Sequence, residues 1–181
     1  MDGEPWRTVP DAVVVSCGLA AGVELDRPLL RRLRTALREA EALATAGRVV
    51  SRRDVSRHSL DERLVRAGIA AGARERAVTA FVETGAVDDR RLAERRAEQL
   101  AERGWGDEAI RLRLEEAGIG GKDVEAALGS LPREADRAAR LAADATDPRK
   151  AWALLARRGF DPDTVADVLA PLDEDDPGGL G

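Results

Sequence analysis

Cys17 and His58 are the residues whose chemistry comes closest to a catalytic pair. They are the only cysteine and the only histidine among 181 residues, so a thiolate activated by an imidazole would need both of them. A free cysteine usually behaves as a small buried apolar side chain. One cysteine and one histidine are also too few for a zinc site built on these ligands. We therefore expect a structural Cys17, and its lack of a disulfide partner suits a reducing compartment.

Asp88 and Asp89 are adjacent carboxylates that invite a metal or acid–base interpretation. They directly follow Gly85-Ala86-Val87 and precede an arginine-rich helical stretch. An aspartate at that place caps a helix, and a second one favours its N-terminal dipole. Since no third ligand accompanies them, we predict a helix cap at Asp88 rather than a metal site.

The remaining sequence predicts a non-catalytic protein without a cofactor, a metal or a small-molecule substrate. It contains no glycine-rich phosphate loop and no nucleophile with a base and an orienting group. No apolar run approaches the roughly 18 residues that cross a bilayer, and the first residues lack the pattern of a signal peptide. We therefore expect a cytoplasmic protein that does not bind membranes.

Charge is distributed unevenly along the chain. The formal net charge is −5, but residues 161–181 contain seven acidic residues and no lysine or arginine, which leaves 27 acidic against 29 basic residues in 1–160. The body of the chain is thus nearly neutral with local basic clusters, so that charge alone neither requires nor excludes a nucleic-acid partner.

Composition and periodicity predict helices almost throughout. Charged residues make up 35% of the chain and aromatic residues only 3%. An apolar stripe predicts a helix over Leu29–Ala46, capped by Asp26, with Pro28 in its first turn and Gly47 as its stop. Val13-Val14-Val15 is the one β-branched run and indicates a short strand. A strand needs a partner, which favours a natural amino terminus upstream of Met1.

One sequence pattern occurs three times in the chain. A leucine stands four residues before a glycine, and an apolar residue follows that glycine, in residues 64–69, 114–119 and 155–160. Eight residues before each glycine lie Leu60, Ile110 and Ala151, and twelve before it lie the helix-starting residues Ser56, Gly106 and Asp147. Positions four and eight before the glycine share a helical face, and a glycine with positive φ ends such a helix. Gly68, Gly118 and Gly159 are therefore predicted caps.

The three copies of this pattern predict an all-α, elongated tandem array of three-helix repeats. The expected organisation is an irregular or strand segment at 1–25, a long helix with repeat 1 at 26–89, repeat 2 at 90–132 and repeat 3 at 133–172. An acidic, disordered tail at 173–181 completes the chain. The predicted first helices of repeats 2 and 3 are Arg90–Arg103 and Glu134–Ala145.

Several spaced residues resemble the hallmark of the RecX family of regulatory proteins. That family shows a glycine and an apolar pair before two aspartates, then an arginine-rich helix, a Gly-aromatic-Gly triplet and a helix ending in Gly-Ile. The residues that match are Gly85, Asp88, Asp89, Gly104, Trp105, Gly106, Ile110, Leu114, Gly118 and Ile119. The likeness extends upstream through Ser56–Leu64 and downstream to Gly159-Phe160, and covers roughly residues 13–172. Leu92 and Arg96 stand where the family has aromatic residues. Any contact that those aromatic rings make in the family is therefore not supported for this protein.

The resemblance implies three tandem three-helix units that bind the RecA recombinase filament, with single-stranded DNA inside it as a further possible contact. It implies inhibition of RecA ATPase and strand exchange, and thereby a role in DNA repair and recombination. The candidate partner-binding residues are Arg52, Arg53, Arg57, Arg95, Arg96, Arg103, Trp105, Arg111, Arg113, Arg157 and Arg158.

Each candidate has a plainer alternative. The arginines could form solvated faces, and Arg111 and Arg113 point in different directions on a helix, so we expect at most one to be a principal contact. Trp105 is better explained by burial between two helices than by an exposed anchor, and Trp152 by a boundary between repeats. The alternative function is a stand-alone helical nucleic-acid-binding module.

Overall fold

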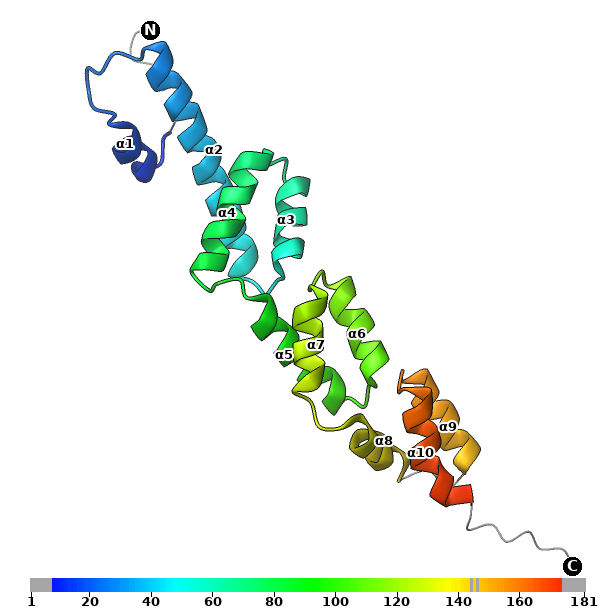
Figure 1. The fold of residues 1–181 in the computed structure, drawn as a ribbon. Coiled ribbons are helices and arrows are strands. Elements are labelled where there is room, and N and C mark those ends of the chain that lie inside the picture. Colours follow the sequence, from blue (N-terminus) through cyan, green and yellow to red (C-terminus); the bar gives the residue numbers. More distant parts are fainter. Residues whose placement is uncertain (1–7, 144, 146, 174–181) are drawn as a thin grey trace, which may run out of the picture. The chain divides into compact units, whose positions relative to one another are not determined.

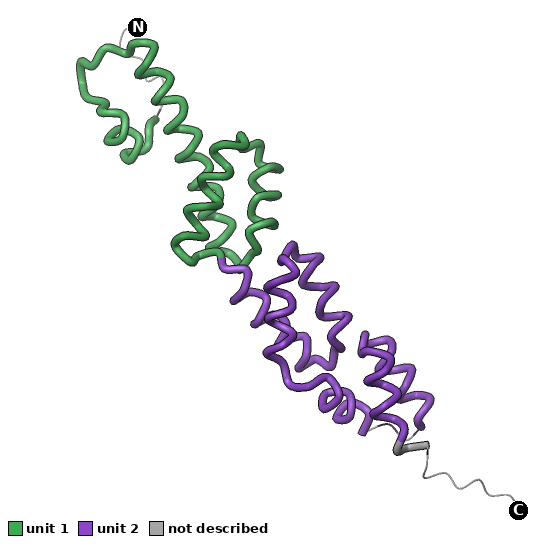
Figure 2. The backbone as a smooth tube through the Cα atoms, in the orientation of Figure 1, with its two compact units in different colours: residues 1–87 green, residues 88–181 purple. Residues whose placement is uncertain are grey.

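The computed structural model describes residues 8–143, 145 and 147–173, with side chains described up to residue 170, and these residues form helices and connecting loops (Figure 1). They form two compact units, which Figure 2 colours separately: residues 1–87 and residues 88–181. Unit 1 contains α1 (Asp11–Cys17), α2 (Arg27–Val50), α3 (Arg57–Arg66) and α4 (Ala71–Glu83). Unit 2 contains α5 (Asp89–Glu102), α6 (Asp107–Glu116), α7 (Gly121–Gly129), α8 (Glu134–Ala142), α9 (Pro148–Arg157) and α10 (Pro162–Asp173). The predicted all-α class is confirmed.

The strand predicted at Val13–Val15 is wrong, because these residues lie in α1. Val13 and Cys17, four residues apart, are buried on one face of this helix and pack with Leu33 of α2, whereas Val15 is 81% exposed. The β preference of valine is small and depends on context. Packing of one helical face against α2 outweighs it, and no partner strand is needed.

Helix α2 runs further than predicted. Asp26 caps it as expected, accepting a hydrogen bond from Leu29 N at 2.8 Å. Gly47 does not stop it, because Ala46 is buried in the core of unit 1 and Val49 and Val50 pack against that core. The energy of this packing exceeds the roughly 1 kcal/mol that a glycine costs inside a helix.

Three groups of three helices each enclose an apolar core. The first core is formed by α2, α3 and α4 in unit 1, the second by α5, α6 and α7, and the third by α8, α9 and α10, both in unit 2. Leu64, Leu114 and Leu155 are fully buried at equivalent places in these cores. Leu92, which stands where the family has an aromatic residue, is buried as well.

The predicted glycine caps are confirmed at all three positions. Gly68, Gly118 and Gly159 have φ of 75°, 74° and 72°. In each case the amide after the glycine donates to the carbonyl of the buried leucine five residues earlier, at 3.0, 3.1 and 3.2 Å. This is the Schellman arrangement, in which the apolar residue after the glycine folds back onto the core. The helices that end there start at Ser56, Gly106 and Asp147, as the repeat predicts.

A second shared feature escaped the sequence comparison. The first helix of each group buries two alanines four residues apart: Ala42 and Ala46, Ala93 and Ala97, Ala138 and Ala142. Such small side chains let the other helices of the group approach closely. Helix α10 continues to Asp173, and the rest of the predicted acidic tail lies outside the described residues.

Candidate functional site

The two residues that suggested catalysis do not form a pair. Cys17 is buried in the cluster of α1 and α2, whereas the His58 side chain is exposed on α3, with Nε2 at 3.4 Å from Glu62 Oε1. Asp88 is the N-cap of α5 and accepts from Arg91 N at 3.0 Å, which confirms the cap interpretation. Within the described ranges, no group of three His, Cys, Asp or Glu side chains is placed to hold a metal ion. The helices of these same ranges are all too short or too polar to span a membrane.

Two of the segments that resemble the family, Gly104-Trp105-Gly106 and Gly159-Phe160 with the preceding Arg158, lie in direct backbone contact within unit 2. Gly106 N donates to Arg158 O at 2.9 Å, which joins the start of α6 to the end of α9. A Cβ atom on Gly106 would come within 2.2 Å of Gly159 O, and one on Gly159 within 2.6 Å of Ala109 Cβ. Glycine at both places is therefore required by the close approach of the second and third helix groups.

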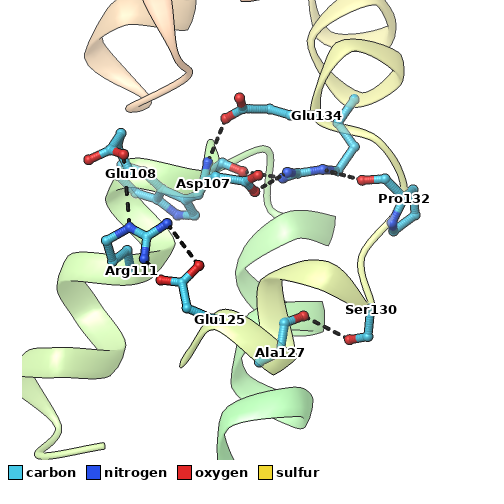
Figure 3. Close-up of polar contacts among 10 residues, drawn as sticks. Asp107, Glu108, Arg111, Glu125, Ala127, Ser130, Pro132 and Glu134 are labelled. Atoms are coloured by element: carbon cyan, nitrogen blue, oxygen red, sulfur yellow. Dashed lines mark hydrogen bonds and ion pairs between the residues drawn. The ribbon is translucent and has the colours of Figure 1, made fainter. Parts of the chain in front are cut away.

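A buried arginine crosses the same junction. Arg137 of α8 is 6% exposed and donates to the backbone oxygens of Trp105 at 2.8 Å and Pro132 at 3.1 Å, and to the carboxylate of Asp107. Asp107 N in turn donates to Glu134 Oε1 at 2.6 Å (Figure 3). We call Arg137, Asp107 and Glu134 the polar clamp. It connects the start of α6 to α8 by charge-assisted hydrogen bonds, which are stronger than neutral ones.

Burial raises the pKa of the Glu134 carboxyl above the ordinary glutamate range, and the nearby charge of Asp107 acts in the same direction. Hydrogen bonds from the backbone of Asp107 and Asp161, and the charge of Arg137, oppose this effect. The ionised form of Glu134 is thus held in the clamp at a desolvation cost.

Trp105 lies at the edge of the clamp, and the guanidinium groups of two arginines lie over its ring. The Arg113 guanidinium carbon is 3.7 Å from the ring centroid and that of Arg158 is 4.8 Å from it. Arg158 also donates to Arg103 O at 2.9 Å. The ring itself is half-buried against the second core, which agrees with the prediction that Trp105 packs between helices. Cation–π contacts of this kind hold both arginines in place.

Unit 2 has a groove of about 480 Å³ between α6 and α9. We call it the α6–α9 groove; its walls include Trp105, Arg111, Leu112, Arg113, Ala156 and Arg157. The Arg111 side chain forms an ion pair with Glu125 and lies 3.9 Å from Glu108 (Figure 3). Arg113 instead covers Trp105, so the two arginines do point in different directions as predicted.

The other predicted partner-binding residues are not gathered at this groove. Arg52, Arg53 and Arg57 lie in unit 1, where all three are exposed at the end of α2 and the start of α3. Arg95 is exposed and Arg96 half-buried on α5. The structure therefore brings together Arg103, Trp105, Arg111, Arg113, Arg157 and Arg158, all in unit 2.

Sequence reasoning missed the clamp and misjudged one tryptophan. Arg137 does not stand out in the sequence, because a buried arginine has no local sequence signal. Trp152 was expected at a boundary between repeats, but it is 55% exposed on α9. The helical spacing of α9 could have indicated the exposure of Trp152. The buried residues Ala151 and Leu155 are four apart and define the inner face of the helix, and Trp152 lies off that face.

Comparisons with known proteins point to one family. The chain is 33% identical over 150 residues to Regulatory protein RecX of Stenotrophomonas maltophilia (strain K279a), covering 77% of this chain and 91% of that protein. It is 30% identical over 139 residues to Regulatory protein RecX of Halorhodospira halophila, covering 71% and 86%. No protein-family model matches the chain.

Solved structures agree at the level of the fold. A crystal structure of regulatory protein RecX superposes with a TM-score of 0.78 at 21% identity, over 94% of this chain and 92% of that one. RecX from Lactobacillus salivarius gives 0.69 at 18% identity, over 76% and 97%. The sequence relatives are similar over most of their length and the fold is shared, so this chain belongs to the family of RecX regulatory proteins.

Proposed function

We propose that the protein binds the RecA recombinase filament and inhibits its ATPase and strand-exchange activities. The observation that carries this proposal is the similarity to RecX regulatory proteins over 91% of a relative's length. The α6–α9 groove supports it, because basic and apolar side chains meet there as they do in protein interfaces. Arginine and tryptophan are also the residue types that contribute most to such interfaces.

Inhibition by binding alone needs no catalytic group in this protein. A filament that hydrolyses ATP passes through more than one conformation, and a ligand that binds one of them more tightly increases its population. A shift from 1:99 to 99:1 requires a preference of about 10⁴-fold between the two states. Contacts with several filament subunits would supply such a preference through multivalency.

The test is ATP hydrolysis by the cognate recombinase on single-stranded DNA, measured while the protein is added. We expect inhibition that saturates near stoichiometric amounts, together with loss of strand exchange. Unchanged hydrolysis at stoichiometric protein would refute the proposal.

The same preparation also tests the alternative of a stand-alone nucleic-acid-binding module. Binding to duplex DNA without recombinase, with a steep dependence on salt, would favour that function. The exposed Arg52 and Arg53 are the residues to replace in that case.

A further inference from the structure

The outer face of α9 is basic at both ends of the helix. Arg149, Lys150 and Arg157 are exposed, and the helix contains no acidic residue. Its inner face, with Ala151 and Leu155, fills the third core. Among the described residues, the three basic side chains form no ion pair. They are therefore available to a partner of opposite charge.

Apolar surface accompanies these charges. Trp152 is 55% exposed, and Ala153 and Ala156 beside it are exposed as well. Trp152 and Ala156 are four residues apart, so they share one face of α9, and Ala156 lines the α6–α9 groove. Across the groove, Leu112 of α6 is also 55% exposed. A large apolar side chain thus projects from each of the two helices.

The α6 side of the groove has a different charge pattern. Arg111 is neutralised by Glu125, while Glu108 and Glu115 line the groove and add negative charge. Phosphate groups of a nucleic-acid strand would be repelled by these glutamates, and strand binding generally requires a positive groove along the backbone. A protein segment with an apolar centre and carboxylates on one side only matches this pattern better.

The groove is also held in shape before any partner arrives. The Gly106–Gly159 contact fixes the separation of α6 and α9, and the stack of Arg113 on Trp105 forms part of the wall. A preformed site avoids the entropy cost of ordering side chains when a ligand binds.

We propose that the α6–α9 groove is the docking site for an acidic protein segment. An apolar side chain of that segment enters the groove between Leu112 and Ala156, and a carboxylate faces Arg157 in the groove wall. Trp152, Arg149 and Lys150 lie outside the groove lining on the exposed surface of α9, where the segment continues. The inference rests on the proposed function for the source of the segment, which is the recombinase filament.

The first experiment uses the free protein and synthetic peptides. A leucine–glutamate peptide, the same peptide with glutamine for each glutamate, and a leucine–lysine version are titrated at low salt while amide shifts are followed by NMR. We expect the acidic peptide to shift groove residues and to bind about tenfold more tightly than the glutamine version, with the lysine version weakest. Equal binding, no binding or a preference for lysine overturns the proposal.

Variants locate that binding. Trp152→Ala and Arg157→Glu are each expected to weaken the acidic peptide by about tenfold, whereas Val65→Ala, at an exposed valine of unit 1, is the matched control and leaves it unchanged. An oligothymidylate is titrated in parallel. If it shifts the same residues at lower concentration than the acidic peptide, the groove binds nucleic acid and the proposal is wrong.

The second experiment repeats the ATPase assay with the groove variants. Leu112→Ser and Trp152→Ala are expected to raise the concentration needed for half-inhibition by about tenfold, with Val65→Ala unchanged. Normal inhibition by both groove variants overturns the docking site and leaves the proposed function standing. Absence of inhibition by the natural sequence refutes the proposed function, and the peptide titration then decides the docking site by itself.

Discussion

The close contact between the second and third helix groups of unit 2 is tested most directly by a substitution at Gly106. Its backbone, with φ −79° and ψ 168°, is one that alanine adopts without strain. Gly106→Ala therefore adds only a methyl group, which would come within 2.2 to 2.4 Å of the Gly159 and Phe160 backbone. Backbone atoms cannot rotate away, so the second and third helix groups must separate or remain overpacked.

The cost of the substitution combines the loss of a glycine cap with either overpacking or separation of the two groups. Loss of a glycine N-cap to alanine costs about 0.5–1 kcal/mol. Overpacking costs about 1–3 kcal/mol, and if the groups separate instead, the Gly106–Arg158 hydrogen bond, worth about 0.5–1.5 kcal/mol net, is lost with its neighbours. We expect Gly106→Ala to lower the free energy of unfolding by about 1.5–4 kcal/mol.

Gly120 provides the matched control. It is the N-cap of α7 with similar angles, φ −70° and ψ 148°, and a Cβ there would meet nothing within 4 Å. Gly120→Ala should therefore show the cap contribution alone, about 0.5–1 kcal/mol. Urea unfolding followed by circular dichroism and tryptophan fluorescence measures both variants. If the two lose the same stability, the close approach of Gly106 to Gly159 has no energetic consequence and the reasoning is refuted.

Three further variants test the cores and the clamp. Leu114→Ala should lower the unfolding free energy by about 2–5 kcal/mol in urea, because the Leu114 side chain is fully buried. Leu112→Ala, at an exposed site, should change it by no more than about 0.5 kcal/mol. Similar losses in the two variants would contradict the core assignment. Arg137→Met should cost about 3 kcal/mol, because it leaves Asp107 and the Trp105 carbonyl without a donor. The control Arg140→Met, at an exposed position on the same helix, should be nearly neutral. Equal stability of the two variants would show that the clamp contributes nothing. Glu134→Gln keeps an acceptor for Asp107 N but cannot ionise. The raised pKa of Glu134 stabilises the natural sequence at acid pH, and this stability is lost as pH rises through that pKa. The unfolding free energy of Glu134→Gln, taken relative to the natural sequence, should therefore increase from about pH 4 to pH 7. A difference that does not change with pH would contradict the desolvation cost.

Local chemistry let the sequence alone predict the repeat. A glycine that takes positive φ, a leucine four residues before it and an apolar residue after it act within two turns of one helix. Their spacing therefore predicted the caps at Gly68, Gly118 and Gly159 and the buried leucines. The helix start at Asp88 was predicted separately, from the capping preference of aspartate. The family resemblance depends on the same local residues, which is why it was visible without coordinates.

Only the tertiary structure decided features that depend on residues far apart in the chain. Val13–Val15 is helical and α2 passes through Gly47 because each packs against another helix, and that packing energy is absent from any local window. The burial of Arg137 follows from carbonyl and carboxylate partners up to 32 residues away. The α6–α9 groove likewise exists only because Gly106 and Gly159, separated by more than a whole helix group, approach until no side chain fits between them.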